Sequence, residues 1–281
     1  MKRVILAVLF DYAARAAGAL VLAAPVGAMV AASGIGNFPE GDRLLFERGG
    51  LLLVEVVRAS WALLPPLAAS SLVSGVVVFG ALTLPQAILW SALGETAPES
   101  TNTFLGRACA RVPAFLALTG LGFLAQILVL TLGLTAAGFL HGRATHDEMR
   151  TDLVALTALA VAALLALSCG VLRDVAGATL ACGAANGRAA LRAGLRVFLR
   201  SPLALAARWF VPASLGGALV LAVAFAVGRL DVGRSEGFRF LAVAVLHQLV
   251  VLGLTVCRAV WFRGAVRIVR PQLEAVSEAR R

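Results

Sequence analysis

Long uncharged apolar stretches recur along this chain of 281 residues and limit what it can fold into. A helix rises about 1.5 Å per residue, so about 20 apolar residues cross the hydrocarbon core of a bilayer. Charged residues interrupt the chain between such stretches. We therefore expect six transmembrane helices, near residues 16–32, 66–93, 112–140, 153–172, 203–228 and 240–261.

The composition requires lipid as the main solvent of the chain. Hydrophobic residues make up 60% and charged residues 14%, against about one quarter charged in soluble domains. Lys2 is the single lysine, and the mean hydropathy is +0.91. The sequence predicts an all-α polytopic membrane bundle forming one domain over residues 1–281, with short interfacial amphipathic helices.

The first residues resemble a secretory signal, because Lys2 and Arg3 precede the apolar stretch 4–10. Asp11 and Arg15 interrupt that stretch, and the longer uncharged run begins only after them. We expect no cleavage here, but a short interfacial helix followed by the first span.

The distribution of charged residues between the predicted connections indicates how the chain is oriented in the membrane. With six spans and both termini on one side, that side carries 17 basic and 6 acidic residues, a net charge of +11, and the other side carries 8 basic and 9 acidic residues, a net charge of −1. Basic connections stay in the cytoplasm. We expect both termini in the cytoplasm and the protein in a bacterial inner membrane, where lipid contact explains the charge better than nucleic-acid binding.

A faint internal repeat appears when the chain is shifted by 89 positions. Each repeat is predicted to contain a membrane helix, a turn of small residues, a short arginine-bearing helix and a proline that begins the next span. The residues that coincide are Ala87 and Ala176, Ala92 and Ala181, Gly94 and Gly183, Arg107 and Arg196, Arg111 and Arg200, and Pro113 and Pro202.

The segments 94–113 and 183–202 share this layout and the pattern R-x-x-x-R-x-P. In layout the chain resembles uncharacterised bacterial six-helix membrane proteins, whose named relative is the membrane domain attached to some glycerophosphodiester phosphodiesterases. The soluble catalytic barrel of those enzymes has no counterpart in this sequence, so no phosphodiesterase residues carry over. The resemblance implies a membrane-embedded accessory module.

The sharpest local pattern is Arg188, Arg192, Arg196 and Arg200, spaced four residues apart on one side of a helix. Leucines and Phe198 form the adjoining side, which favours a helix lying in the cytoplasmic interface. We expect these arginines, with Arg107 and Arg111, to contact anionic lipid or a membrane-protein partner, which includes a second copy of this chain. A simple topology anchor is the plainer interpretation.

Polar residues are scarce inside the predicted spans. Gln86, Gln126, His247 and Gln248 are the candidates, and we expect interhelical hydrogen bonds among the last three. A cavity lined by all four would favour transport. In the first outer connection, residues 51–64 predict an interfacial helix, with a re-entrant segment as the alternative.

Catalytic and metal-binding patterns do not emerge. The sequence lacks a phosphate-binding loop, an H-E-x-x-H pair and a G-x-S-x-G elbow. Residues of the loop near His141 and Asp152 are a weak metal grouping, and we expect no metal and no cofactor. Four cysteines are expected to be reduced thiols on the cytoplasmic side: Cys109, Cys169, Cys182 and Cys257.

Two functions follow from these patterns. The first is a non-enzymatic module or accessory subunit that contacts lipid or a partner protein through its arginine-rich helices. The alternative is a transporter or permease subunit, with a substrate path between repeated helix pairs. An enzyme is less favoured, because no nucleophile and base can be paired.

Overall fold

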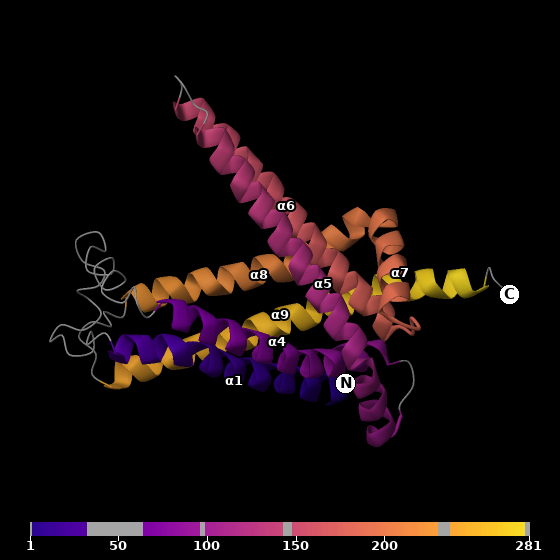
Figure 1. The fold of residues 1–281 in the computed structure, drawn as a ribbon. Helices are drawn as coiled ribbons and strands as arrows, with labels where there is room; N and C mark the ends of the chain where they lie inside the picture. The colour runs from indigo at the N-terminus through magenta and orange to yellow at the C-terminus, as the bar shows by residue number, and fades with distance from the viewer. Residues whose placement is uncertain (1, 33–63, 96–98, 143–147, 230–236, 279–281) are drawn as a thin grey trace. The chain divides into compact units, whose positions relative to one another are not determined.

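The computed structural model describes the chain except residues 1, 33–63, 96–98, 143–147, 230–236 and 279–281. The described residues form helices and no strand, in agreement with the predicted all-α class (Figure 1). The helices are α1 (Lys2–Ala32), α4 (Leu64–Gly94), α5 (Thr101–Gly142), α6 (Glu148–Ala181), α7 (Gly187–Arg200), α8 (Pro202–Arg229) and α9 (Gly237–Glu278).

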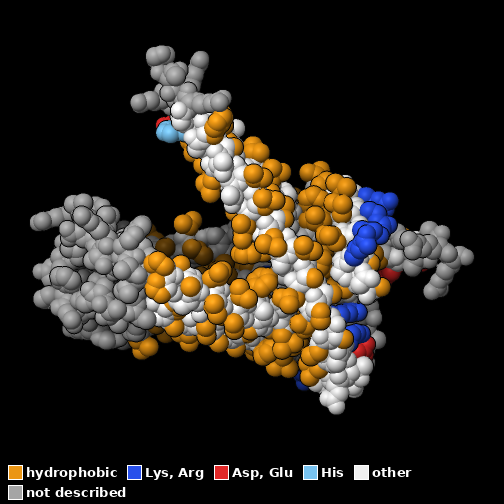
Figure 2. All heavy atoms as spheres, viewed as in Figure 1, with side chains coloured by type: hydrophobic (Ala, Val, Ile, Leu, Met, Phe, Trp, Pro, Cys, Tyr) orange, Lys and Arg blue, Asp and Glu red, His pale blue; other side chains and the backbone are white. Residues whose placement is uncertain are grey.

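All of these helices except α7 are long and apolar enough to cross a membrane, which makes six candidate spans in the described part. Large apolar side chains cover their outer surfaces, as Figure 2 shows on one face. Leu72 is 70% exposed, Leu124 63% and Leu221 72%. Such surfaces suit contact with acyl chains rather than water. The chain is therefore a multi-pass membrane protein.

The predicted spans 66–93 and 203–228 coincide closely with α4 and α8. The expectation of a separate interfacial helix before the first span is wrong, because α1 runs without a break from Lys2. Asp11 and Arg15 lie one turn apart on α1, and their carboxylate and guanidinium groups pair at 2.8 Å. This pairing lets the two charges stay within a continuous helix.

Proline marks a helix boundary in one half of the predicted repeat and not in the other. Pro202 begins α8, as expected, and α7 ends just before it. Pro113 instead lies inside α5, which starts at Thr101, so the predicted break there is wrong. Proline removes a single backbone donor, and the turns on either side keep their own hydrogen bonds.

Contacts between Cα atoms divide the chain into two compact units, Met1–Gln86 with Ala213–Arg258 and Ala87–Pro212 with Ala259–Arg281. We refer to these as unit 1 and unit 2. Small residues bring helices together in unit 1, where Gly18 faces Val78 and Gly253 faces Leu219. A single domain over the whole chain stays a prediction.

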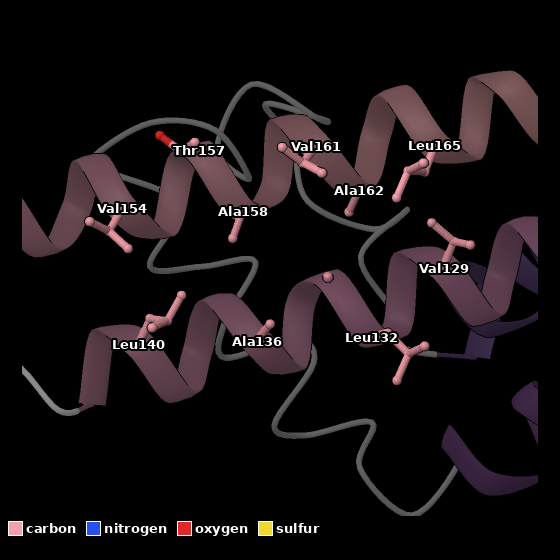
Figure 3. Close-up of a pocket in the computed structure, with 11 residues that line it drawn as sticks. Val129, Leu132, Ala136, Leu140, Val154, Thr157, Ala158, Val161, Ala162 and Leu165 are labelled. Carbon is pink, nitrogen blue, oxygen red and sulfur yellow. The ribbon is translucent and has the colours of Figure 1, made fainter.

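In unit 2, α5 and α6 lie side by side along most of their length (Figure 1). Gly133 permits the close approach, because a Cβ atom there would overlap the side chain of Ala162. Beside this contact lies a groove of about 600 Å³, lined by apolar side chains and by Thr157 (Figure 3). The Thr157 hydroxyl donates to the carbonyl of Leu153, so it offers no free polar group. The groove suits acyl chains.

Unit 2 also holds a core of aromatic and small side chains. The rings of Trp90 on α4 and Phe262 on α9 stack with centroids 3.9 Å apart and planes at 19°. Gly177 on α6 lies directly against Trp90, where a Cβ atom would come within 3.1 Å of the indole. This packing holds α4, α6 and α9 together.

Candidate functional site

The predicted second and fourth connections and the C-terminal tail meet in unit 2. Gly94 at the end of α4 lies against Ala181 at the end of α6, so closely that a Cβ atom on Gly94 would come within 2.6 Å of the Ala181 carbonyl oxygen. On α9, the side-chain amide of Gln272 donates to the Ser201 hydroxyl at 3.1 Å. Three of the segments that the charge pattern places on one side therefore lie together in unit 2.

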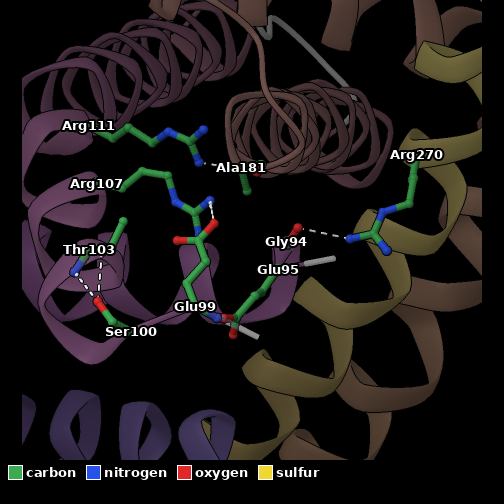
Figure 4. A network of polar contacts seen from close by, with 9 residues as sticks. All are labelled: Gly94, Glu95, Glu99, Ser100, Thr103, Arg107, Arg111, Ala181 and Arg270. Atoms are coloured by element: carbon green, nitrogen blue, oxygen red, sulfur yellow. Dashed lines mark hydrogen bonds and ion pairs between the residues drawn. The ribbon is translucent and has the colours of Figure 1, made fainter. Parts of the chain in front are cut away.

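Arginines from other helices cap both of these helix ends (Figure 4). The guanidinium of Arg270 on α9 donates to the carbonyl of Gly94 at 3.0 Å, and that of Arg111 on α5 donates to the carbonyl of Ala181 at 3.2 Å. The last carbonyls of a helix lack partners within it and carry partial negative charge. Each cation therefore stabilises the end that it touches.

Gly183 shapes the turn between α6 and α7. Its backbone has φ of +112°, a conformation that glycine adopts without strain. The N–H groups of Gly183 and Ala184 donate back to the carbonyls of Leu180 and Thr179, at 3.2 and 3.0 Å. This is the Schellman arrangement. It ends α6 sharply and directs the chain into α7.

Helix α7 is fixed against α6 by one of its faces. The Asn186 side chain caps its first turn by accepting from the N–H of Ala189 at 2.9 Å. Gly194 lies against the backbone of Ala176, and the Thr179 hydroxyl lies 2.8 Å from the carbonyl of Ala190. The orientation of α7 on α6 is therefore set by packing and hydrogen bonds.

The remaining surface of α7 is exposed and amphipathic. Figure 2 shows basic side chains gathered over α7 beside hydrophobic ones. Leu195 is 44% exposed and Leu199 68%. No acidic residue lies on this helix. We call this surface the α7 arginine face; its basic residues are all exposed and are Arg188, Arg192, Arg196 and Arg200.

Arg107 and Arg111, predicted to contact lipid or a partner, have partners within unit 2. The Arg107 guanidinium lies 2.6 Å from the Glu99 carboxylate, and Arg111 caps α6 as described above. Sequence reasoning missed Arg270 and Glu99 as the groups that organise these helix ends. Arg270 lies outside the segments 94–113 and 183–202 that carry the repeat, so the repeated arginine spacing gives little signal for the cap.

A buried polar cluster joins α6 to α9. The indole N–H of Trp261 donates to one carboxylate oxygen of Asp174 at 2.9 Å. Arg173 donates twice to the other oxygen, at 3.0 Å. Both carboxylate oxygens thus accept hydrogen bonds from side chains of the protein, as expected of a cluster that stabilises the fold.

The predicted intramembrane polar residues have separate surroundings. Gln126 donates from α5 to the carbonyl of Ala166 on α6 at 3.0 Å, and Gln248 accepts from the Tyr12 hydroxyl at 2.9 Å. Both bonds are interhelical, but the expected bonds among Gln126, His247 and Gln248 are wrong in their partners. His247 and Gln248 are exposed on α9, whereas Gln86 is buried.

The cysteines and the residues of the predicted metal grouping were also located. The four cysteines are free, and burial raises the pKa of the Cys182 thiol despite the opposing effect of Arg270. His141 lies 3.2 Å from Asp152, and within the described ranges no three His, Cys, Asp or Glu side chains are grouped as a metal site.

Comparison with known proteins identifies no relative of this chain. The resemblance to the membrane domain of glycerophosphodiester phosphodiesterases, drawn from layout, stays a prediction. The chain matches no protein-family model, no curated protein and no solved structure.

Proposed function

We propose that this protein is a non-enzymatic module of a bacterial inner membrane that holds anionic lipid at the cytoplasmic leaflet through the α7 arginine face. The observation that carries the proposal is the joint exposure of four arginines and adjoining leucines on one docked helix. An accessory role beside a catalytic or transport subunit agrees with the resemblance described above.

The physical argument rests on two adjacent surfaces of α7. Guanidinium groups near an anionic leaflet each contribute about 1 kcal/mol, and they bind phosphate oxygens in pairs. Exposed leucines such as Leu195 and Leu199 gain by entering the acyl region beneath the headgroups. Because Gly194 and Thr179 fix α7 on α6, both surfaces are presented without loss of conformational freedom.

The orientation is part of the proposal. Placing the α7 side in the cytoplasm assigns the net charge of +11 to the inner leaflet and leaves −1 outside. The meeting of Gly94, Ala181 and Arg270 in unit 2 supports one common side for the second and fourth connections and the tail.

Lipid analysis of the purified full chain tests this function. The α7 variant changes Arg188, Arg192, Arg196 and Arg200 to Gln, and the matched control changes Arg43, Arg48, Arg143 and Arg234 to Gln. Both are extracted in mild detergent, and bound phosphatidylglycerol, cardiolipin and protein are quantified. We expect the α7 variant alone to hold less anionic lipid than the unmodified protein. Equal lipid retention by both variants, or loss of a co-purifying protein without loss of lipid, would refute the proposal.

A further inference from the structure

Unit 2 has a second basic surface, formed by residues of α8 and α9 and by none of α7. The start of α8 and the last part of α9 enclose a groove of about 540 Å³. Arg208 enters it from α8, and Arg263 and Arg267 from α9. The rest of its lining is apolar or small, and includes Val211, Pro212, Val260 and Gly264. We call this the α8/α9 groove.

Gly264 lets Arg208 of α8 lie close to α9. A Cβ atom on Gly264 would contact the Cβ and Cδ atoms of Arg208 at 3.5 Å, so the aliphatic part of Arg208 lies against α9 at this glycine. Arg263 and Arg267 are one turn apart on α9. Arginines therefore line both walls of the groove.

The three charges of the groove are not balanced by acids. All three arginines are exposed, and no carboxylate in the described part lies within ion-pair distance of them. Three cations that line one groove repel one another, and the repulsion is strongest where lipid and protein reduce the local dielectric constant. An anion between these groups removes that repulsion.

On each helix, larger apolar residues line the groove on one side of the arginines. On α8, Arg208 is followed by Val211 and Pro212, and on α9 the arginines are preceded by Val260. Val211 is 58% exposed and Val260 56%. These apolar residues lie nearer the middle of each candidate span than the arginines do. A ligand that fills the groove needs an anionic end and an apolar end.

We infer that the α8/α9 groove binds one phospholipid with an anionic headgroup. Its phosphate lies among Arg208, Arg263 and Arg267, and an acyl chain follows Val211 and Val260. A free phosphate would satisfy only the charged end. The inference depends on the membrane setting and not on the α7 arginine face, because none of the α7 arginines lines this groove.

Native mass spectrometry of the full chain in detergent tests the inference. The probes are phosphatidylglycerol, phosphatidylcholine and inorganic phosphate, each titrated separately and in competition. The test variant is Arg208→Gln with Arg263→Gln. Each guanidinium contributes about fivefold to affinity near an anionic headgroup, so we expect phosphatidylglycerol to bind about 25-fold more weakly. Arg208→Lys with Arg263→Lys retains both charges and most of the affinity.

Two matched variants separate this groove from other surfaces. Arg188→Gln with Arg192→Gln removes the same charge from α7 and should leave the high-affinity phosphatidylglycerol site intact. Ala207→Trp fills the groove from an exposed position without changing its charge, and should abolish that site.

Several outcomes would overturn the inference. They are unchanged phosphatidylglycerol affinity in the groove variant, an equal loss in the α7 variant, equal affinity for phosphatidylcholine, and full displacement of the lipid by inorganic phosphate. The two proposals can fail separately. The groove inference fails if the groove variant keeps its phosphatidylglycerol affinity, and the α7 proposal fails if the α7 variant keeps its bound anionic lipid.

Discussion

Trp261 and Asp174 are 87 positions apart in sequence, and the indole N–H of one donates to the carboxylate of the other at 2.9 Å. Both side chains are buried in unit 2. The bond joins α9 to α6 beside the ring stack of Trp90 and Phe262. It thereby ties the segment of α6 that leads into α7 to the part of α9 that lines the α8/α9 groove.

Trp261→Phe keeps the aromatic packing and removes the donor to Asp174. A buried carboxylate oxygen without its partner costs about 1–3 kcal/mol, so we expect the free energy of unfolding in detergent to fall by that amount and the unfolding midpoint to fall with it. Trp209→Phe makes the same chemical change at a half-buried position on α8. Equal midpoints for the two variants would show that the bond to Asp174 does not stabilise the fold.

Arg111→Met removes the cation that caps α6 and keeps an apolar stem of similar length. The Ala181 carbonyl then loses its donor, and we expect the last turn of α6 to open more easily by about 1 kcal/mol. Hydrogen exchange in residues 178–184 measures this opening. Arg111→Lys should show a smaller effect because the charge remains. Unchanged exchange in Arg111→Met would refute the capping role.

Gly194→Ala places a methyl group 2.9 Å from the backbone of Ala176, so α7 and α6 have to move apart to make room for it. Overpacking of this kind costs about 1–3 kcal/mol, and we expect α7 to detach from α6 and become sensitive to protease. Gly120→Ala is the matched control, because nothing lies within 4 Å of its added methyl group. Greater protease sensitivity in the control than in Gly194→Ala would contradict the packing described here.

Cys182 should react slowly with maleimides at neutral pH. Burial raises the pKa of this thiol, so the reactive thiolate forms only as the pH rises above the ordinary thiol range. In a variant that retains Cys182 alone, the rate should keep rising at alkaline pH. A rate that reaches its plateau near neutral pH would show that Arg270 lowers the pKa more than burial raises it.

The spans could be predicted from sequence because membrane crossing depends on local hydropathy and length. Such reasoning located α4 and α8 almost to the residue. It placed the start of α5 too late, because Arg107 and Arg111 read as interfacial charges. Their partners, Glu99 and the Ala181 carbonyl, become neighbours only after folding.

Of the two candidate sites, one could be predicted from the sequence and the other could not. The α7 arginine face follows from a strict spacing of four residues within one helix, and it could be predicted. The α8/α9 groove could not, because Arg208 lies 55 positions from Arg263 in sequence. The packing of Arg208 against Gly264 places arginines of the two helices on one groove.

The membrane orientation of α5 is the most direct test of the central claim. Cys109 is exposed near the start of α5, and Gly142 ends it about 50 Å away, farther than the hydrocarbon core is thick. Two single-cysteine variants, one with Cys109 and one with Gly142→Cys, are treated with a membrane-impermeant maleimide in right-side-out and inverted vesicles. We predict labelling of Cys109 in inverted vesicles only and of Gly142→Cys in right-side-out vesicles only. The opposite pattern, or labelling of both sites from one side, would contradict the account.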